Sequence, residues 1–241
     1  MKSAQRILLV SSSTVYGRGY LDHVEQQIEA FLGEAKRILF FPYALYDLDG
    51  YAAQAKARFG VMGYSLESVH RAANPRKAVE NADAFFVGGG NTFRLLKALQ
   101  DVDLLDAIGR KVESGAPYIG SSAGSNVAGP TIKTTKDMPI VQPRSFDSLG
   151  VVRFQISPHF QDPDPNSRHM GETQEERILQ FLEENETPVV GIREGAWLIC
   201  ENGAVTLRGE AGARIFRRGK LPVEAKPGDN IIDLVGAPNG S

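Results

Sequence analysis

The first 120 residues alternate between short apolar runs and segments with helical periodicity. The apolar runs that we predict as strands are 6–10, 38–43, 60–66, 84–87 and 116–119. The helical patterns lie at 21–32, 46–59, from 74 onward, 95–99 and 104–112. Strands that alternate with helices pair in parallel, because each helix returns the chain across the sheet. The sequence therefore predicts an α/β fold with a mostly parallel sheet and helices on both faces.

The second half of the chain has a different pattern. Residues 131–150 show no periodicity, and Thr173 with Glu176 forms a capping box that predicts the start of a helix. The further predicted strands are 151–156, 189–192, 197–200, 204–207 and 214–216. Asn202-Gly203 between two of them predicts a C-terminal β-hairpin. We expect one domain over 1–241, with a loosely ordered tail over about 221–241.

Composition excludes several classes of function. A net charge of -2 over 241 residues gives no electrostatic reason to expect nucleic acid or an anionic membrane as a partner. No apolar run is long enough to span a bilayer. The single cysteine, Cys200, excludes an internal disulfide and is typical of a cytoplasmic protein. Four histidines without paired spacing argue against a zinc site, so we expect no metal. The oligomeric state stays open, with a homodimer among the alternatives.

Residues 120–124 read Gly-Ser-Ser-Ala-Gly, which is a G-x-S-x-G motif between a predicted strand and a predicted helix. In that context the motif builds a sharp turn that presents the hydroxyl of Ser122 at the end of the strand. The alternative is a tight turn without a catalytic role, because small residues are common in turns. A second glycine-bearing turn, 88–92, follows another predicted strand. Both turns are therefore expected at the edge where parallel sheets bind ligands.

A nucleophilic serine needs a base within hydrogen-bond reach and an acid that orients the base. His159 is the leading base, because it follows a predicted strand and a proline. The alternative for His159 is a structural histidine satisfied by backbone groups. Asp137 and Glu194 are the best candidates for the acid, since most other carboxylates lie on predicted helix faces. The pattern of residues does not decide between the two.

The glycine triplet 88–90 lacks the spacing of phosphate-binding motifs, so a nucleotide site is poorly supported. A different use fits the triplet better. The backbone N–H of Gly90, together with that of Ala123, is placed to form an oxyanion hole. Asn91 either contacts substrate or caps the helix that follows.

Six short segments of the chain form an ordered set of motifs. They are 87–93, 120–126, 130–139, 158–160, 171–173 and 194–197. Together they resemble the peptidase E family of alpha-aspartyl dipeptidases, over most of the chain up to about residue 220. The resemblance implies a flavodoxin-like sheet related to class I glutamine amidotransferases, with serine in place of cysteine. It also implies cleavage of dipeptides that begin with aspartate.

The resemblance assigns Ser122 as nucleophile and His159 as base, with either Asp137 or Glu194 as the third member of the triad. The chain departs from the family at two positions. Ser121 stands where the family has a large aromatic residue. Gln174 stands where the family often has an arginine, which we associate with the substrate's aspartyl carboxylate. A strict preference for aspartate is therefore in question, unless Arg168 in the preceding loop takes over.

The sequence thus predicts a cytoplasmic serine exopeptidase that acts on a small peptide substrate, Asp-X, without a metal or organic cofactor. One alternative keeps the chemistry but changes the specificity, as in a broader dipeptidase or the related cyanophycinase-type enzymes that cleave aspartyl-arginine polymers. The other alternative is a non-catalytic module that binds small molecules on the same sheet.

Overall fold

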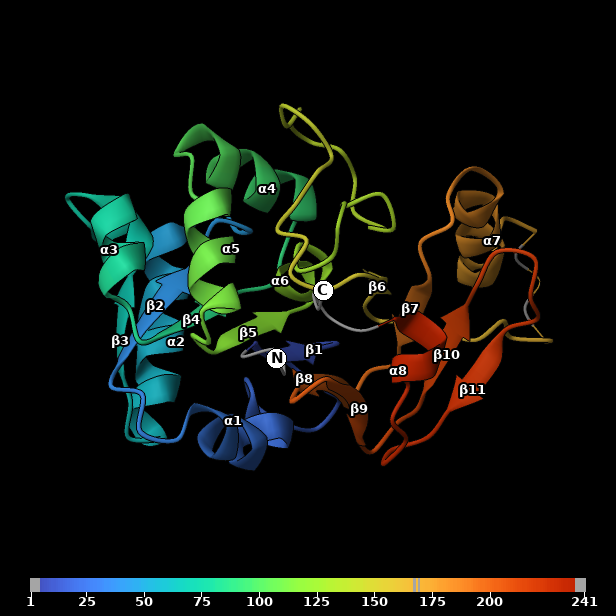
Figure 1. The fold of residues 1–241 in the computed structure, drawn as a ribbon, viewed down its shortest axis with the longest axis horizontal. Helices are drawn as coiled ribbons and strands as arrows, with labels where there is room; N and C mark the ends of the chain where they lie inside the picture. Colours follow the sequence, from blue (N-terminus) through green and yellow to red (C-terminus); the bar gives the residue numbers. More distant parts are fainter. Residues whose placement is uncertain (1–4, 167, 169, 237–241) are drawn as a thin grey trace.

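The computed structural model describes residues 5–166, 168 and 170–236, and its centre is a seven-stranded sheet (Figure 1). The strands are β1 (Arg6–Val10), β2 (Arg37–Phe41), β3 (Ser65–Ser68), β4 (Ala84–Val87), β5 (Tyr118–Ser121), β8 (Ala196–Glu201) and β9 (Ala204–Gly209). Their order is β3-β2-β4-β5-β1-β8-β9. The first five strands of this order run parallel, and β8 and β9 are antiparallel to their neighbours. The predicted mostly parallel α/β sheet is confirmed.

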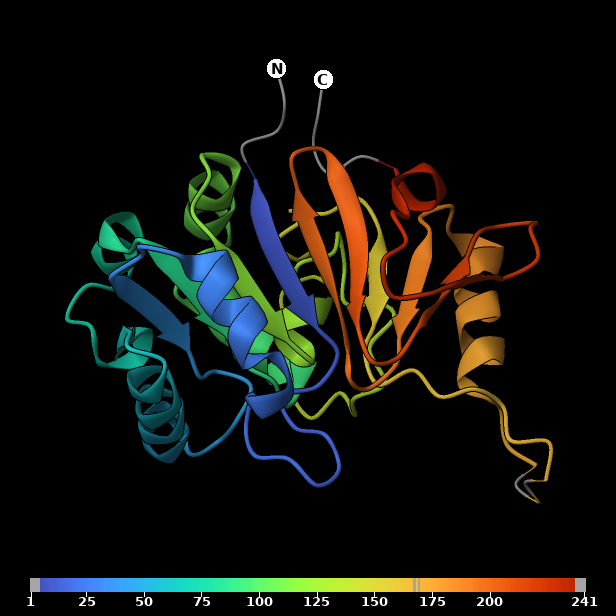
Figure 2. The same ribbon diagram turned by 90° about the horizontal axis from the view of Figure 1, so that it is seen from below.

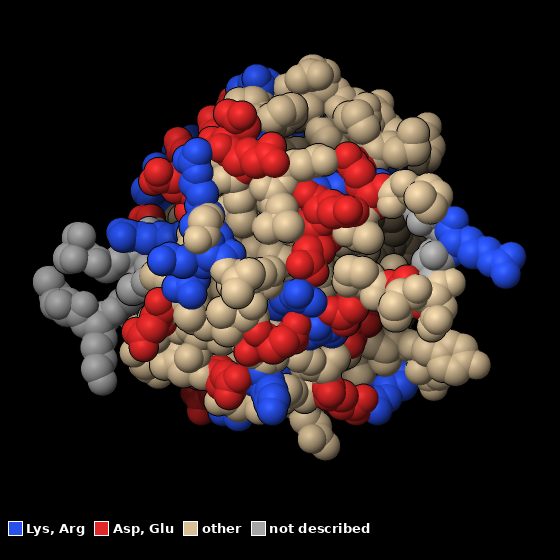
Figure 3. Space-filling view, turned by 90° about the vertical axis from the view of Figure 1, so that its right-hand side faces the viewer, with Lys and Arg blue, Asp and Glu red and all other residues tan. Residues whose placement is uncertain are grey.

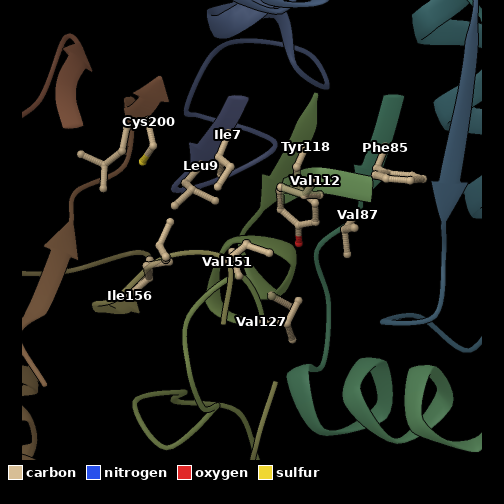
Figure 4. Packing of buried hydrophobic residues seen from close by; sticks show 14 of the residues in the cluster. Ile7, Leu9, Phe85, Val87, Val112, Tyr118, Val127, Val151, Ile156 and Cys200 are labelled. Atoms are coloured by element: carbon tan, nitrogen blue, oxygen red, sulfur yellow. The ribbon is translucent and has the colours of Figure 1, made fainter. Parts of the chain in front are cut away.

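Helices cover both faces of this sheet. One face carries α1 (Glu25–Leu32) and α2 (Leu48–Val61); the other carries α3 (Pro75–Asn81), α4 (Thr92–Asp101), α5 (Leu105–Glu113) and α6 (Ala123–Asn126), as Figure 2 also shows. Alternate residues of β1 point to opposite faces, as the period of a strand requires. Leu8 and Val10 belong to the core under α1 and α2, whereas Ile7 and Leu9 lie in the opposite core, shown in Figure 4.

A second, four-stranded sheet lies beside the first and was not predicted from the sequence. Its order is β11 (Val223–Ala225), β10 (Ala213–Phe216), β7 (Val189–Ile192) and β6 (Gln155–Ser157). One face packs on α7 (Gln174–Glu184), and the other joins the core of the main sheet. Strands covered on both faces read as continuous apolar runs, and such runs do not reveal which strand pairs with which. The single domain stays a prediction, which this shared core supports.

Local signals for turns and caps are confirmed. β8 and β9 form a hairpin in which Asn202 and Gly203 have φ of 53° and 77°, the left-handed values of a type I′ turn. Asn74 caps α3 with Pro75 at its start, and Thr173 caps α7 through the predicted capping box.

Three predicted boundaries are wrong. Gly60 and Val61 still belong to α2, so the strand predicted over 60–66 is in fact β3. The strand predicted over 151–156 is reduced to β6, because the chain bends before Gln155. The segment 221–236, expected to be loosely ordered, contains β11 and the short α8 (Ile232–Val235). Ala225 and Val235 are buried there: β11 pairs with β10 of the second sheet, and the residues before α8 bond to β9 of the main sheet.

Charged side chains of both signs are mixed on the face that carries α7 and β11 (Figure 3). Arg193 is paired there with Asp162 at 2.6 Å and with Glu224 at 3.0 Å. Mixed charge of this kind produces no field of one sign that would attract a polyanion. Within the described residues, none of the helices combines the length and the apolar character that crossing a membrane requires.

Candidate active site

Ser122 lies on a strained turn between β5 and α6. Its φ of 53° and ψ of −111° are values that residues with a side chain rarely adopt. The turn is fixed by a hydrogen bond of 3.0 Å from the Ser122 N–H to the carbonyl of Val10, at the end of β1. Strain of this kind costs about 1–3 kcal/mol and is concentrated at functional sites. This is the strand–turn–helix geometry that the G-x-S-x-G motif predicts.

The glycines around this turn are required by close packing. A Cβ atom on Gly124 would overlap the carbonyl oxygen of Val87, and one on Gly120 would overlap the carbonyl oxygen of Gly124. A Cβ atom on Gly89 would stand 2.9 Å from the Cβ of Ser122. The glycine loop that follows β4 is therefore in contact with the serine turn.

We expect Gly124→Ala to lower the free energy of unfolding by about 1–3 kcal/mol, because the added methyl group has no space. Gly109→Ala is the matched control: Gly109 lies in α5 with no atom within 4 Å of the added Cβ, so alanine should be neutral or stabilising. Urea unfolding of both variants measures the difference. Equal stability of the two variants would contradict this account of the motif.

His159 stands between Ser122 and Glu194 in a continuous chain of hydrogen bonds. Its Nε2 lies 2.8 Å from the Oγ of Ser122, and its Nδ1 lies 2.9 Å from the Oε1 of Glu194. An ionised carboxylate can only accept, so Nδ1 carries the proton and Nε2 accepts from the serine hydroxyl. One third of the His159 side chain and about half of the Glu194 side chain, 33% and 54%, are exposed, so the chain is open to a solute.

The backbone of His159 is held by Ser11, a residue that was not among the candidates predicted from the sequence. Ser11 is fully buried directly after β1; its Oγ accepts from the His159 N–H at 2.9 Å and donates to the carbonyl of Ile192 at 2.8 Å. His159 itself has a left-handed φ of 53°. Ser11 thus connects the main sheet to the two loops of the second sheet that carry His159 and Glu194. The available signal was a serine at the very end of a buried strand.

Asp137, the other candidate acid, has different partners. Its Oδ2 accepts from the N–H of Thr92 at 2.7 Å and from the Thr92 hydroxyl at 2.6 Å. A carboxylate at the start of α4 interacts favourably with the positive end of the helix dipole. Of the two acids that the sequence left open, the structure brings Glu194 to His159 and Asp137 to a helix start.

The two amides predicted to bind an oxyanion border the serine turn. Within the part of the chain that the structure describes, the N–H groups of Gly90 and Ala123 have no hydrogen-bond acceptor. Gly90 has φ of 134°, and a Cβ atom there would lie 2.6 Å from the carbonyl oxygen of Ala44. Glycine is therefore needed to aim this amide.

The predicted substrate-binding residues have separate positions. Asn91 caps α4 through its Oδ1, which accepts from the Arg94 N–H at 3.0 Å, and its Nδ2 donates to the carbonyl of Met138 at 2.9 Å. The capping alternative is thus observed. Gln174 is the first residue of α7, and its Oε1 accepts from the Gln161 N–H at 3.0 Å. Arg168 is exposed on the loop between β6 and α7.

A second chain of a serine, a histidine and a carboxylate lies at the far edge of the main sheet. His70 joins the Oγ of Ser68 at 2.6 Å to the Oδ1 of Asp49 at 2.8 Å. Asp49 also pairs with Arg71 at 2.7 Å, and β2 and β4 separate this cluster from β5. We interpret it as a structural link between η2 (Val69–Arg71) and α2, because it adjoins neither glycine turn.

Cys200 is fully buried, and burial raises the pKa of its thiol to about 12, so it is a poor nucleophile. The residues that the structure describes contain no group of three or more His, Cys, Asp or Glu that could hold a metal ion.

Comparisons with known proteins show which family and which fold this chain shares. The sequence model of peptidase family S51 matches residues 7–208. A protein named peptidase E from Streptomyces coelicolor is 49% identical over 229 residues, which cover 95% of this chain and 94% of that protein. A Drosophila melanogaster protein named "Probable alpha-aspartyl dipeptidase" is 44% identical over 220 residues, covering 90% and 92%. The crystal structure of a peptidase from an acI-B1 actinobacterium shares the fold, with a TM-score of 0.71 at 16% identity, covering 95% of this chain and 98% of that one. The resemblance to peptidase E is confirmed.

Proposed function

Because this chain belongs to peptidase family S51 and is a serine dipeptidase, we propose that it hydrolyses dipeptides that begin with aspartate through Ser122, His159 and Glu194. The observation that carries the proposal is the hydrogen-bond chain from the Ser122 hydroxyl through His159 to the Glu194 carboxylate. A serine hydroxyl is a weak nucleophile until an adjacent base accepts its proton, and the base works best when an acid fixes its tautomer.

In the acylation step, Ser122 Oγ attacks the carbonyl carbon of the N-terminal residue while His159 Nε2 takes the hydroxyl proton. The resulting oxyanion is stabilised by the amides of Gly90 and Ala123, a contribution of about 3 kcal/mol for each such donor. His159 then gives the proton to the amine of the second residue. That amino acid leaves, and an aspartyl ester remains on Ser122.

In the deacylation step, a water molecule replaces the departed amine. His159 takes a proton from the water, which attacks the ester carbonyl, and then returns a proton to Ser122 Oγ. Glu194 stabilises the imidazolium in both steps without itself becoming protonated. Free aspartate and the serine hydroxyl are the final products.

Aspartate at the N-terminus is proposed from the Drosophila relative's name, "Probable alpha-aspartyl dipeptidase". Gln174 does not provide the positive charge that such a substrate needs, so another residue must provide it. We also propose a cytoplasmic location, which a single buried thiol, Cys200, supports because it suits a reducing compartment.

A panel of Asp-Leu, Asn-Leu and Ala-Leu tests this function. We expect kcat/KM to be highest on Asp-Leu by at least about tenfold, because an ionic hydrogen bond to the substrate carboxylate contributes roughly 1.5–3 kcal/mol. Release of free leucine is the measurement. Equal kcat/KM values on the three peptides would contradict the aspartate preference and favour a broader dipeptidase.

A further inference from the structure

A small basic pocket lies next to His159, between the loop 133–136, the end of β6 and α7. Its volume is about 160 Å³, room for about five water molecules at roughly 30 Å³ each. Its lining residues are Lys133, Thr134, Thr135, Lys136, Ser157, Gln174, Arg177, Ile178 and Phe181. Three of them are cations and none is a carboxylate. The pocket is therefore suited to a small anionic group.

Lys136 is the cation that connects this pocket to the catalytic residues. Its Nζ donates to the carbonyl oxygen of His159 at 2.8 Å, so the ammonium group lies beside the backbone of the base. Its neighbour Asp137 is anchored to Thr92 at the start of α4, and this anchoring fixes the course of the loop. An ammonium group has three hydrogens, and the bond to His159 uses only one of them.

The charges that face Lys136 come from three parts of the fold. Asp137 adjoins it in the loop, Glu194 faces it from the turn before β8, and Arg177 faces it from α7. Removal of water lowers the pKa of the Lys136 ammonium group to about 8; the two carboxylates oppose this shift and Arg177 adds to it. In the described part of the chain, no carboxylate oxygen lies within 4.0 Å of Lys136 Nζ. Its charge is thus only partly compensated, as expected for a cation that receives an anionic ligand.

The other two cations of the pocket are less suitable. Arg177 is paired with Glu172 at 3.8 Å. Lys133 and Lys136 are both exposed, but Lys136 is the one whose Nζ is bonded to the backbone of His159. Gln174 contributes a neutral donor, because the Gln161 N–H occupies its Oε1 and thereby leaves its Nε2 hydrogens to donate elsewhere.

We propose that Lys136 binds the side-chain carboxylate of the substrate's N-terminal aspartate, with the Gln174 amide as a second donor. The assignment rests on the proposed function. A carboxymethyl side chain is short and constant in every Asp-X substrate, and therefore fits a pocket of this size, which Ile178 and Phe181 help to line. The second residue varies in size among Asp-X peptides, so its carboxylate is not expected in a pocket of small, fixed volume. Lys136 is thus the residue that determines specificity.

The test compares Lys136→Met with the wild type on Asp-Leu and Asn-Leu. We expect kcat/KM on Asp-Leu to fall by about 10- to 100-fold, the typical effect of losing a hydrogen bond between charged groups. The fall in kcat/KM on Asn-Leu should be smaller by about tenfold. The ratio of kcat/KM on Asp-Leu to that on Asn-Leu should therefore fall by about tenfold. Lys136→Arg keeps the charge and should restore part of the ratio. Lys220→Met, at an exposed lysine of the loop between β10 and β11 that does not line the pocket, is the matched control and should leave the ratio unchanged.

Three outcomes would overturn the assignment. Equal losses on both peptides would mean that Lys136 acts by positioning His159, and no loss would mean that the pocket is not used. If Lys136→Met lowers kcat/KM on Asp-Leu but not on Asp-Leu amide, which lacks the C-terminal carboxylate, then Lys136 binds that C-terminal carboxylate instead. A wild type that releases no leucine from any of the three dipeptides fails differently, because it contradicts the proposed function as well.

The pH dependence gives an independent reading of the same site. kcat/KM reports the ionisation of the free enzyme. Lys136 is charged below pH of about 8 and neutral above it, so the ratio of Asp-Leu to Asn-Leu should fall as the pH rises through that value. Ionisations that affect both peptides alike, such as that of the substrate amino group, largely cancel in the ratio. Lys136→Arg should keep its ratio constant to higher pH, because arginine stays protonated; a ratio that falls equally in this variant would exclude Lys136 as the titrating group.

Discussion

Ser122→Ala is expected to lower kcat on Asp-Leu by roughly 10⁴- to 10⁶-fold, the range found when a serine nucleophile is removed from a catalytic triad. Alanine retains the Cβ atom, so the strained backbone at φ of 53° meets no new contact. The Ser122 hydroxyl is hydrogen-bonded to His159 and has no other partner among the described residues. The loss should therefore be confined to turnover, which release of leucine measures.

Two controls separate lost chemistry from lost folding. The free energy of unfolding of Ser122→Ala should remain within about 0.5 kcal/mol of the wild-type value, as for other substitutions that remove no packing. A phosphonate or sulfonyl fluoride should label the wild type at Ser122 and leave the variant unlabelled. Hydrolysis by the variant at more than about one per cent of the wild-type rate would rule out the serine mechanism. An unlabelled wild type would favour the non-catalytic binding module.

Glu194→Gln is expected to have the second largest effect, a fall in kcat of about 10²- to 10⁴-fold. The amide is nearly the same size as the carboxylate but carries no charge, so it cannot stabilise the imidazolium of His159. Its NH₂ group can also donate to Nδ1, which would select the tautomer that cannot take the serine proton. Steady-state kinetics on Asp-Leu measure the effect.

Asp137→Asn is the matched comparison for Glu194→Gln. Asp137 accepts two hydrogen bonds from Thr92, so its loss should lower stability by about 0.5–2 kcal/mol through the start of α4. Its effect on kcat should be much smaller than that of Glu194→Gln. A larger fall in kcat for Asp137→Asn would exchange the proposed roles of the two acids.

Features encoded by neighbouring residues could be predicted from the sequence. The apolar runs of β1, β4 and β5 predicted the parallel sheet, and Asn202-Gly203 predicted the hairpin. The sharp turn at Ser122 could be predicted because its glycines are required within a motif of five residues. Position along the chain also indicated His159, since a residue directly after a strand lies near the sheet edge.

Features that depend on distant contacts could not be predicted. Judged from the sequence, Asp137 and Glu194 are equally good candidates for the acid of the triad. The pairing of β6 with β7 is what brings Glu194 to His159. The role of Ser11 depends on contacts with residues about 150 and 180 positions away. Lys136 appeared as one charged residue in an irregular segment, because the pocket around it is assembled from three separate parts of the chain.

The boundary between the two sheets has a consequence for when the protein is active. Ser122 belongs to the main sheet, whereas His159 and Glu194 extend from the second sheet, and Ser11 connects the two sheets by hydrogen bonds. Neither sheet alone carries the complete chain of hydrogen bonds from Ser122 to Glu194, so activity requires that the two sheets be docked on each other. Turnover therefore reports this docking, and on gentle warming it should be lost no later than the circular dichroism signal.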